Sequence, residues 1–315
     1  MLHKNKTTIM LTHTDMDGES CLILARSYFK NIIPFRISYN NIKETLLEIK
    51  ECYNTNDNLQ MIITDLNFSK EDFDILLEII HLFDDVVFID HHLYEFEMKS
   101  VKNLQVIIKR KYCACALFYA YMLQYKGFEF NKDFVSLVNT YDLWHYKSSK
   151  FEEACNLNML FWDYGAKRFN NVFLNTPYIT PSQEFKIERI KNNINSYYEE
   201  MENKGLIIYN KLLCFSFLDK HIGELKFKYN SILYANIRNS YHFSLRIADE
   251  ISEDDAKVIR DTIFEALPTY KLINKGGHIH AFGITCEILE IDEIKDYFNK
   301  IQNASLHAFK KLGFV

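Results

Sequence analysis

Glycine and proline are scarce in this sequence, which has 9 and 4 of them among 315 residues. So low a content argues against a loop-rich or disordered chain. The seven cysteines lack paired CxxC spacing, which argues against a disulfide framework or a zinc site and indicates reduced thiols. The sequence has no apolar run of about 18 residues that could span a membrane, and no secretory signal pattern. We therefore expect a cytoplasmic protein.

The sequence also lacks an excess of positive charge: it has 37 lysines and arginines and 42 acidic residues, which gives a net charge of −5. A protein that binds duplex DNA non-specifically normally carries a basic face, so we expect no such binding and a substrate held in a pocket. The hydrophobic share of 48% is typical of a soluble globular protein. A chain of 315 residues is long enough for two domains, each with its own core.

The stretch from Asp85 to His92 organises the rest of the sequence. Its apolar centre, Val86–Ile89, predicts a buried strand covered on both faces. Asp90 and His91 follow, so that the strand runs into residues of metal-ligand type. In an open α/β sheet, ligands collect just beyond the carboxyl ends of such strands. Two adjacent histidines also occur by chance in loops, so the pair needs support from other residues.

Two earlier strands end in acids as well. Thr7–Leu11 is followed by Asp15 and Asp17, and the apolar run that begins at Leu59 ends in Asp65. Aspartates two residues apart are common in ordinary turns, where their side chains bond the backbone, so Asp15 and Asp17 fit either a turn or a ligand site. Asp65 precedes the next expected helix cap, so helix capping does not account for it.

Helices alternate with these strands over the first 145 residues. The alternation predicts right-handed βαβ crossovers and a parallel sheet, which brings the strand ends to one edge. Several acids in one crevice are costly unless a cation neutralises them. Carboxylates mixed with imidazole suit Mn²⁺ or another transition ion better than Ca²⁺. Further expected strands are 32–37 and 105–108, and the expected helices are 20–29, 42–52, one capped by Ser69 with Asp72, 113–125 and 134–143.

The order of these residues resembles the four motifs of the DHH phosphoesterases. Asp142, which by itself would be interpreted as a helix-end residue, completes the set. The resemblance covers about residues 7–145 and implies a parallel-sheet DHH domain that binds two Mn²⁺ ions, with Mg²⁺ or Co²⁺ as substitutes. The matching residues are His13-Thr14-Asp15-Met16-Asp17-Gly18, Asp65, Asp90-His91-His92 and Asp142.

The same resemblance implies a role for each motif residue. Asp65 would bridge the two ions, His92 would face the substrate phosphate, and both would count as catalytic. Asp90 would orient the neighbouring histidine without itself binding a metal ion. Many family members place a histidine four residues before the first motif aspartate, where this chain has Leu11, and His13 resembles the variant of some nuclease-like members. The implied metal ligands are His13, Asp15, Asp17, Asp65, His91 and Asp142.

The second half of the chain carries another motif. A helix with Thr180 as its cap is expected to run to about Lys204 and to connect two domains. Beyond it, the pattern Gly-Gly-His-x-x-Ala-x-Gly resembles the signature of the DHHA1 domain, and Arg246 resembles the substrate-binding strand arginine of that domain. A plain turn and a half-exposed edge arginine are the alternatives. The implied substrate-binding residues are Arg246, Gly276, Gly277 and His278.

The expected organisation is α/β throughout, with the active site in an interdomain cleft. Residues 152–175 carry no motif. In the second half, strands are expected at 206–218, 232–237 and 242–247 and helices at 256–267 and 291–312. The expected parts are an N-terminal parallel-sheet DHH domain at 1–178, a helical linker at 179–205 and a smaller α/β DHHA1 domain at 206–315.

By this resemblance we expect a manganese-dependent phosphodiesterase or exonuclease that hydrolyses short oligonucleotides, as the oligoribonuclease-like members do, and also 3′,5′-bisphosphonucleosides. A hydroxide held between two metal ions would attack phosphorus in line. One alternative is a phosphodiesterase for a cyclic or linear dinucleotide signal. Another is a non-catalytic protein that keeps the fold for binding; it predicts broken ligand positions, and here the motif aspartates and histidines are all present.

Overall fold

The computed structural model describes residues 2–38, 41–53, 58–218, 228–238, 242–277 and 279–315. The chain divides into two units, Met1–Ile190 and Lys191–Val315, and the division falls inside helix α7 (Pro181–Asn203). Each unit has its own sheet and its own hydrophobic core. None of the described helices is both long and apolar enough to cross a membrane. The cytoplasmic location stays a prediction.

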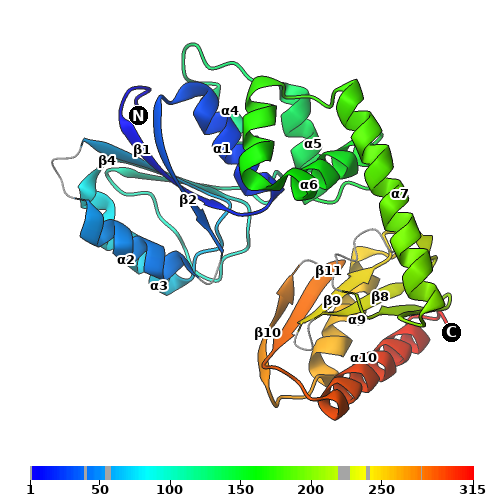
Figure 1. Cartoon of the computed structure of the whole chain (residues 1–315). Helices are drawn as coiled ribbons and strands as arrows, with labels where there is room; N and C mark the ends of the chain where they lie inside the picture. The colour runs from blue at the N-terminus through cyan, green and yellow to red at the C-terminus, as the bar shows by residue number, and fades with distance from the viewer. Residues whose placement is uncertain (1, 39–40, 54–57, 219–227, 239–241, 278) are drawn as a thin grey trace. The chain divides into compact units, whose positions relative to one another are not determined.

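The N-terminal unit contains a five-stranded sheet in which every strand is parallel to its neighbours (Figure 1). The strand order is β2-β1-β3-β4-β5, so the three strands that precede the motif acids lie side by side in the middle. The prediction of a parallel α/β domain is confirmed. The strands are β1 (Thr7–His13), β2 (Asn31–Ile37), β3 (Leu59–Thr64), β4 (Phe83–Asp90) and β5 (Leu104–Ile108).

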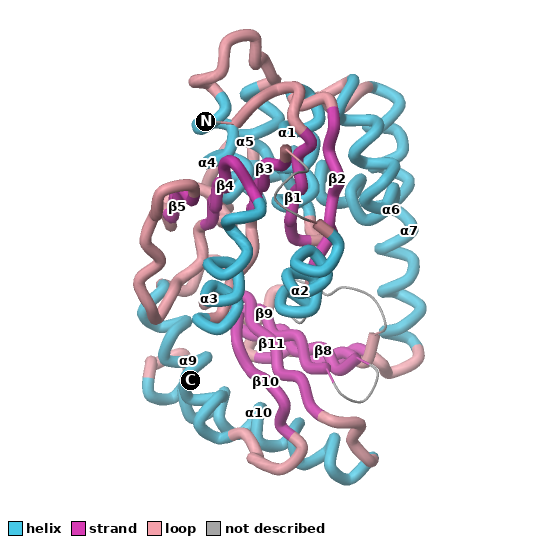
Figure 2. Tube along the Cα trace, turned by 90° about the vertical axis from the view of Figure 1, so that its left-hand side faces the viewer, coloured by secondary structure: helices cyan, strands magenta, loops and turns pink. Residues whose placement is uncertain are grey.

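Helices cover both faces of this sheet (Figure 2). Successive strand residues alternate between two cores: Met10 packs into one, and its neighbours Ile9 and Leu11 pack into the other. Strand β3 is buried at every position, which explains its continuous apolar run. One face carries α2 (Ile42–Cys52) and α3 (Lys70–Ile79), and the other carries α1 (Met16–Tyr28), α4 (Ala114–Met122), α5 (Lys132–Asp142) and α6 (Phe151–Asn175).

Local capping signals set several helix ends. Ser69 and Asp72 form the expected capping box of α3. Helix α1 starts at Met16, four residues earlier than predicted, because Asp15 caps it. The segment 152–175, in which we found no motif, is the long helix α6, and the chain bends there at Gly165, whose φ of 69° lies in the left-handed region.

The C-terminal unit contains a mixed six-stranded sheet in the order β10-β11-β9-β8-β7-β6. Helices α9 (Glu253–Ala266) and α10 (Ile291–Lys311) bury one face of it. Its strands are β6 (Ile207–Tyr209), β7 (Leu213–Ser216), β8 (Leu233–Arg238), β9 (His242–Ile247), β10 (Leu272–Gly277) and β11 (Ala281–Cys286).

One prediction for this unit is wrong in detail. The single strand expected at 206–218 is a hairpin of β6 and β7, because the Asn210 side chain accepts hydrogen bonds from the backbone N–H groups of Leu212 and Leu213 and closes a turn. The two glycines of the motif lie on strand β10, where Gly276 pairs with Gly283 of β11.

Candidate metal centre

The three central strands of the N-terminal unit end at the same level. Thr64 at the end of β3 pairs with Thr12 of β1 on one side and with Ile89 of β4 on the other. The residues that follow these strands therefore meet at one edge of the sheet, as expected of parallel strands. The hydroxyl of Thr64 donates a hydrogen bond to the hydroxyl of Thr12, which in turn donates to the carbonyl of Gly18, tying this edge to α1.

Asp15 acts both as a helix cap and as part of the acidic cluster. One carboxylate oxygen accepts a hydrogen bond from the backbone N–H of Gly18 at 3.0 Å, and the other lies 3.0 Å from Nδ1 of His13. A side chain at Gly18 would place its Cβ 2.8 Å from the carbonyl carbon of His13, so only glycine lets α1 begin this close to β1. Burial raises the pKa of Asp15, but its hydrogen bond and charge interaction with His13 outweigh burial and lower the pKa to about 2.

Asp65 lies at the centre of the cluster in a conformation that few residues adopt. Its φ of 57° is left-handed, and its N–H donates to the carbonyl of Ile89 on β4. The carboxylate is buried: Oδ1 is 3.4 Å from Nε2 of His91, and Oδ2 has no hydrogen-bond partner in the described part of the chain. Burial, together with the charges of Asp15 and Asp17, raises the pKa of Asp65 well above its usual value.

Asp17, His91 and Asp142 form a second side of the cluster. Nε2 of His91 lies 3.5 Å from Oδ2 of Asp142 and 4.0 Å from Oδ2 of Asp17. Asp142, the last residue of α5, carries a buried Oδ2 without a hydrogen-bond partner among the described residues. Burial and the charge of Asp15 raise the pKa of Asp17 to about 7. The helix-end aspartate of the sequence is therefore part of the cluster.

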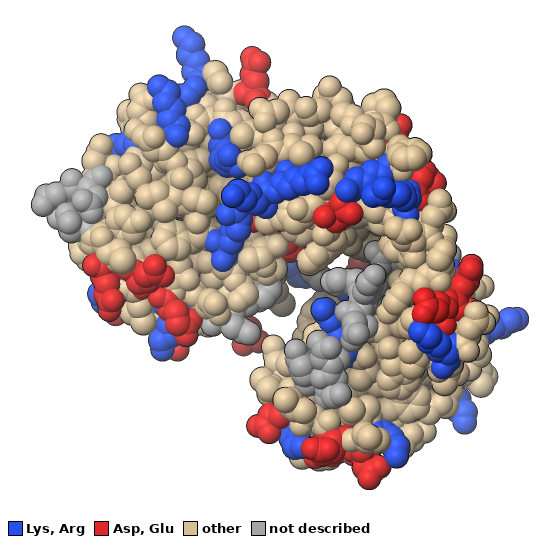
Figure 3. Space-filling model, viewed as in Figure 1, with Lys and Arg blue, Asp and Glu red and all other residues tan. Residues whose placement is uncertain are grey.

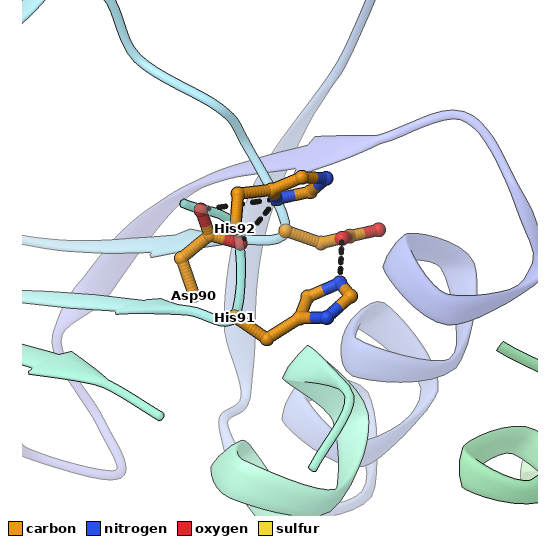
Figure 4. A group of neighbouring side chains, drawn as sticks. Asp90, His91 and His92 are labelled. Carbon is orange, nitrogen blue, oxygen red and sulfur yellow. Dashed lines mark hydrogen bonds and ion pairs between the residues drawn. The ribbon is translucent and has the colours of Figure 1, made fainter. Parts of the chain in front are cut away.

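The Asp90 carboxylate orients His92 (Figure 4). Nδ1 of His92 donates to Asp90 at 2.9 Å, which leaves Nε2 as the ring nitrogen on the side away from Asp90. Burial lowers the pKa of His92, but the hydrogen bond and charge of Asp90 outweigh it and raise that pKa. The hydroxyl of Tyr94 lies between Asp90 and the carbonyl of Leu66 and shares its one proton between these two acceptors. The sequence analysis missed Tyr94, and its position two residues after the His-His pair is the only local signal for it.

The arrangement suits divalent cations. Among the described residues, three groups of side chains each place their ligand atoms within 4.8 Å of one another. Asp65 belongs to two of these groups, and so does His91. One buried oxygen each of Asp65 and Asp142 lacks a hydrogen-bond partner among the described residues, and burial together with repulsion from neighbouring aspartates raises the pKa values of both. A bound cation relieves both penalties. The groups are Asp65/Asp90/His91/His92, His13/Asp15/Asp65 and Asp17/His91/Asp142.

The predicted substrate residues of the C-terminal unit lie on β9 and β10, the two strands that flank β11. Arg246 of β9 pairs with Ala281 of β11, and Gly277 of β10 pairs with Phe282, so the arginine and the glycines occupy the same end of the sheet. His278 lies outside the described residues.

Alternate residues of β9 form a half-exposed polar face of this sheet. His242, Ser244 and Arg246 share it, and the sequence analysis identified only the arginine. Burial and the charges of Arg238 and Arg246 lower the pKa of His242. This face therefore offers the guanidinium of Arg246 and the hydroxyl of Ser244 as hydrogen-bond donors. The neighbouring strands β11 and β10 carry small residues at this end of the sheet, including Ala281 and Gly277.

Two curated proteins resemble this chain in sequence. The oligoribonuclease NrnB of Bacillus subtilis is 25% identical over 210 residues, which are 62% of this chain and 48% of the relative. A 3′,5′-cyclic-nucleotide phosphodiesterase of Helicobacter pylori is 22% identical over 230 residues, which are 61% of this chain and 65% of the relative. The match therefore spans about half of the first relative and less than two thirds of the second. No protein-family model matches the chain.

Several solved structures share the fold, among them the following three. The DHH domain of a protein assigned to a family of ribosomal proteins has a TM-score of 0.56 and 15% identity, over 94% of this chain and 86% of that one. A pGpG-specific phosphodiesterase from Vibrio cholerae has a TM-score of 0.54 and 13% identity, over 96% of this chain and 99% of that one. The exonuclease RecJ bound to manganese has a TM-score of 0.53 and 12% identity, over 96% of this chain and 90% of that one. At these identities the likeness concerns the fold alone.

Proposed function

We propose that this chain, a DHH/DHHA1 phosphoesterase by its motifs, relatives and fold, is a manganese-dependent phosphodiesterase that hydrolyses short single-stranded oligonucleotides. The observation that carries the proposal is the convergence of the motif carboxylates and histidines on one sheet edge, with two buried carboxylate oxygens that have no hydrogen-bond partner among the described residues. Similarity to an oligoribonuclease supports the choice of substrate. Small 3′,5′-bisphosphonucleosides are a further substrate under this proposal.

The ligand set would hold two ions. Asp65 is suited to bridge them, because it joins the group around His13 and Asp15 to the group around His91. Asp17 and Asp142 complete the second position with His91. When bound, divalent cations lower the pKa of water and neutralise charge on the phosphoryl oxygens.

The remaining residues bind and orient the substrate. Asp90 keeps the proton on Nδ1 of His92 and favours the imidazolium, so Nε2 can donate a hydrogen bond to a phosphoryl oxygen. In the C-terminal unit, Arg246 would bind a phosphate of the substrate with its planar guanidinium group. Gly276 would let the backbone approach the same phosphate, since no atom within 4 Å occupies the side-chain position there.

A dinucleotide signal is the second candidate substrate. The cyclic-nucleotide phosphodiesterase among the sequence relatives favours it, as does the pGpG-specific enzyme among the structures of the same fold. The ligand residues are the same for both substrates, so the two candidates differ only in the groups that bind the rest of the nucleotide.

A time course on 5′-labelled RNAs of increasing length, with Mn²⁺ and with a cyclic dinucleotide in parallel, tests the proposal. Cleavage of the shortest RNAs one nucleotide at a time is the expected result, and cleavage of the cyclic compound alone would select the second candidate. Asp65→Asn should abolish turnover, because asparagine tolerates the left-handed backbone but lacks the charge. Asp74→Asn, on the exposed side of α3, is the matched control. Full activity of the Asp65 variant would refute the assignment.

A further inference from the structure

The N-terminal unit has a basic cavity in addition to the acidic metal centre. A cavity of about 550 Å³ is bordered by α1, the edge strand β2 and α6. Four cationic residues line it, namely Arg26, Lys30, Arg36 and Lys167, and no acid is among its described lining residues. Lysine and arginine side chains gather over α1 and α6 on the face shown in Figure 3. Because the chain as a whole has more acids than bases, this concentration of positive charge needs an explanation.

A buried network holds two of the cations in place. Arg36 forms an ion pair with Glu19, whose side chain is fully buried in the first turn of α1. The amide of Asn170, also buried, donates to Glu19 at 2.6 Å and accepts from Arg26 at 3.1 Å. Arg26 also donates to Asn171 at 3.2 Å, and amide oxygens carry no charge to neutralise it. The guanidinium groups are therefore fixed before any ligand arrives.

The two lysines add charge that the described part of the protein does not neutralise. Lys30 and Lys167 are exposed and form no ion pair there, whereas Lys43, Lys50 and Lys70 of the same unit each pair with an acid. Arg26, Lys30 and Lys167 thus leave the cavity with uncompensated positive charge. An anionic ligand relieves this repulsion.

Apart from Asn171, the rest of the lining is apolar. Phe29 forms part of the floor, and Ile32 and Pro34 of β2 form a wall. The volume lies within the range of about 300–1,000 Å³ that is usual for small-ligand sites. Phosphates beside the cations and a base against the apolar wall would match both halves of the lining.

We propose that this cavity binds a nucleoside phosphate, either a free mononucleotide or the terminal nucleotide of a single-stranded oligonucleotide. The site uses none of the residues of the metal centre, so the inference goes beyond the proposed hydrolysis. Both sources present the same chemistry, a phosphate next to an apolar base.

Calorimetric titration of the full chain in EDTA tests this, with 5′-AMP, adenosine, inorganic phosphate and a 5′-phosphorylated adenosine trinucleotide as probes. Lys30→Glu/Lys167→Glu should weaken AMP binding about tenfold or more, because two attractive charges become repulsive. The control variant Lys126→Glu/Lys132→Glu makes the same change in net charge at exposed residues outside the cavity. Its affinity for AMP should stay within about twofold of that of the unmodified protein. Equal weakening in both variants, or in neither, would overturn the proposal.

Two further variants separate this site from others. Ile32→Ala should weaken AMP more than inorganic phosphate, and phosphate binding as tightly as AMP would overturn the nucleoside assignment. Asp65→Asn should bind AMP normally, and loss of binding there would place the ligand at the metal centre instead. A trinucleotide that binds more tightly than AMP identifies an oligonucleotide end as the ligand, whereas equal binding identifies the free nucleotide.

Discussion

The carboxylate of Asp17 accepts a hydrogen bond from the backbone N–H of Ala114 at 2.8 Å and so joins segments 97 residues apart in the sequence. Its other oxygen accepts from the N–H of Cys115 at 2.9 Å. Both amides belong to the first turn of α4, where backbone N–H groups have no partner within the helix and a negative charge is favourable. Asp17 therefore holds α4 against α1 and also offers an oxygen to the metal centre.

This double role predicts opposite stability effects for two ligands of the same centre. Without metal, Asp17→Ala should lower the melting temperature, because it leaves two buried amides unsatisfied at about 1–3 kcal/mol each. Asp142→Ala should leave it unchanged or raise it, because it removes a carboxylate with an oxygen that has no hydrogen-bond partner among the described residues. Thermal melts in EDTA measure both. A larger loss for the Asp142 variant would contradict the predicted order.

The stability of the metal-free protein should fall as the pH rises from about 4 to 8. The folded-state pKa of Asp17 is about 7 against an ordinary 3.8, and those of Asp65 and Asp142 are also raised. The folded state then binds more protons than the unfolded state in this window, so raising the pH favours unfolding. Melting temperatures across that range in EDTA test the sign. Addition of Mn²⁺ should stabilise the protein most at the upper end, and a metal-free stability that rises with pH would contradict the prediction.

Tyr94→Phe should slow turnover about tenfold while the chain stays folded. The tyrosine hydroxyl bonds both Asp90, which orients His92, and the carbonyl of Leu66, next to Asp65. Loss of the hydroxyl should make the positions of Asp90 and of the Leu66 carbonyl less fixed, while every metal ligand stays in place. The readouts are kcat and the Mn²⁺ affinity of the variant, with Tyr178→Phe on the surface as control. An unchanged kcat would show that the hydroxyl has no positioning role.

The two motif glycines should separate folding from binding. Gly277→Ala should destabilise the C-terminal unit, because φ is +124° and the new Cβ would lie 2.6 Å from the carbonyl oxygen of Ala281. Gly276→Ala meets no atom within 4 Å and should fold normally, but it should raise KM if the substrate approaches the backbone there. Melting curves and KM for both variants test this. A normal KM for Gly276→Ala would remove that residue from the substrate site.

Much of the N-terminal unit was predictable because its signals are local. The run from Val86 to Ile89 is buried on both faces of the sheet, and Ser69 caps its helix, as expected from neighbouring residues. The hairpin at Asn210 and the helix at 152–175 were missed, because a turn made by one side chain and a helix without a clear stripe leave weak patterns in the sequence.

Residue order alone decides which side chains follow the buried strands, and the parallel sheet then brings Asp15, Asp65 and Asp90 to one edge. Only the packing of distant segments decides what those side chains contact. The bonds from Asp17 to the start of α4, and from Glu19 to Asn170, 151 residues away, exist because α1 packs against α4 and α6. No local pattern specifies such a partner, since its position depends on how the helices pack on the sheet.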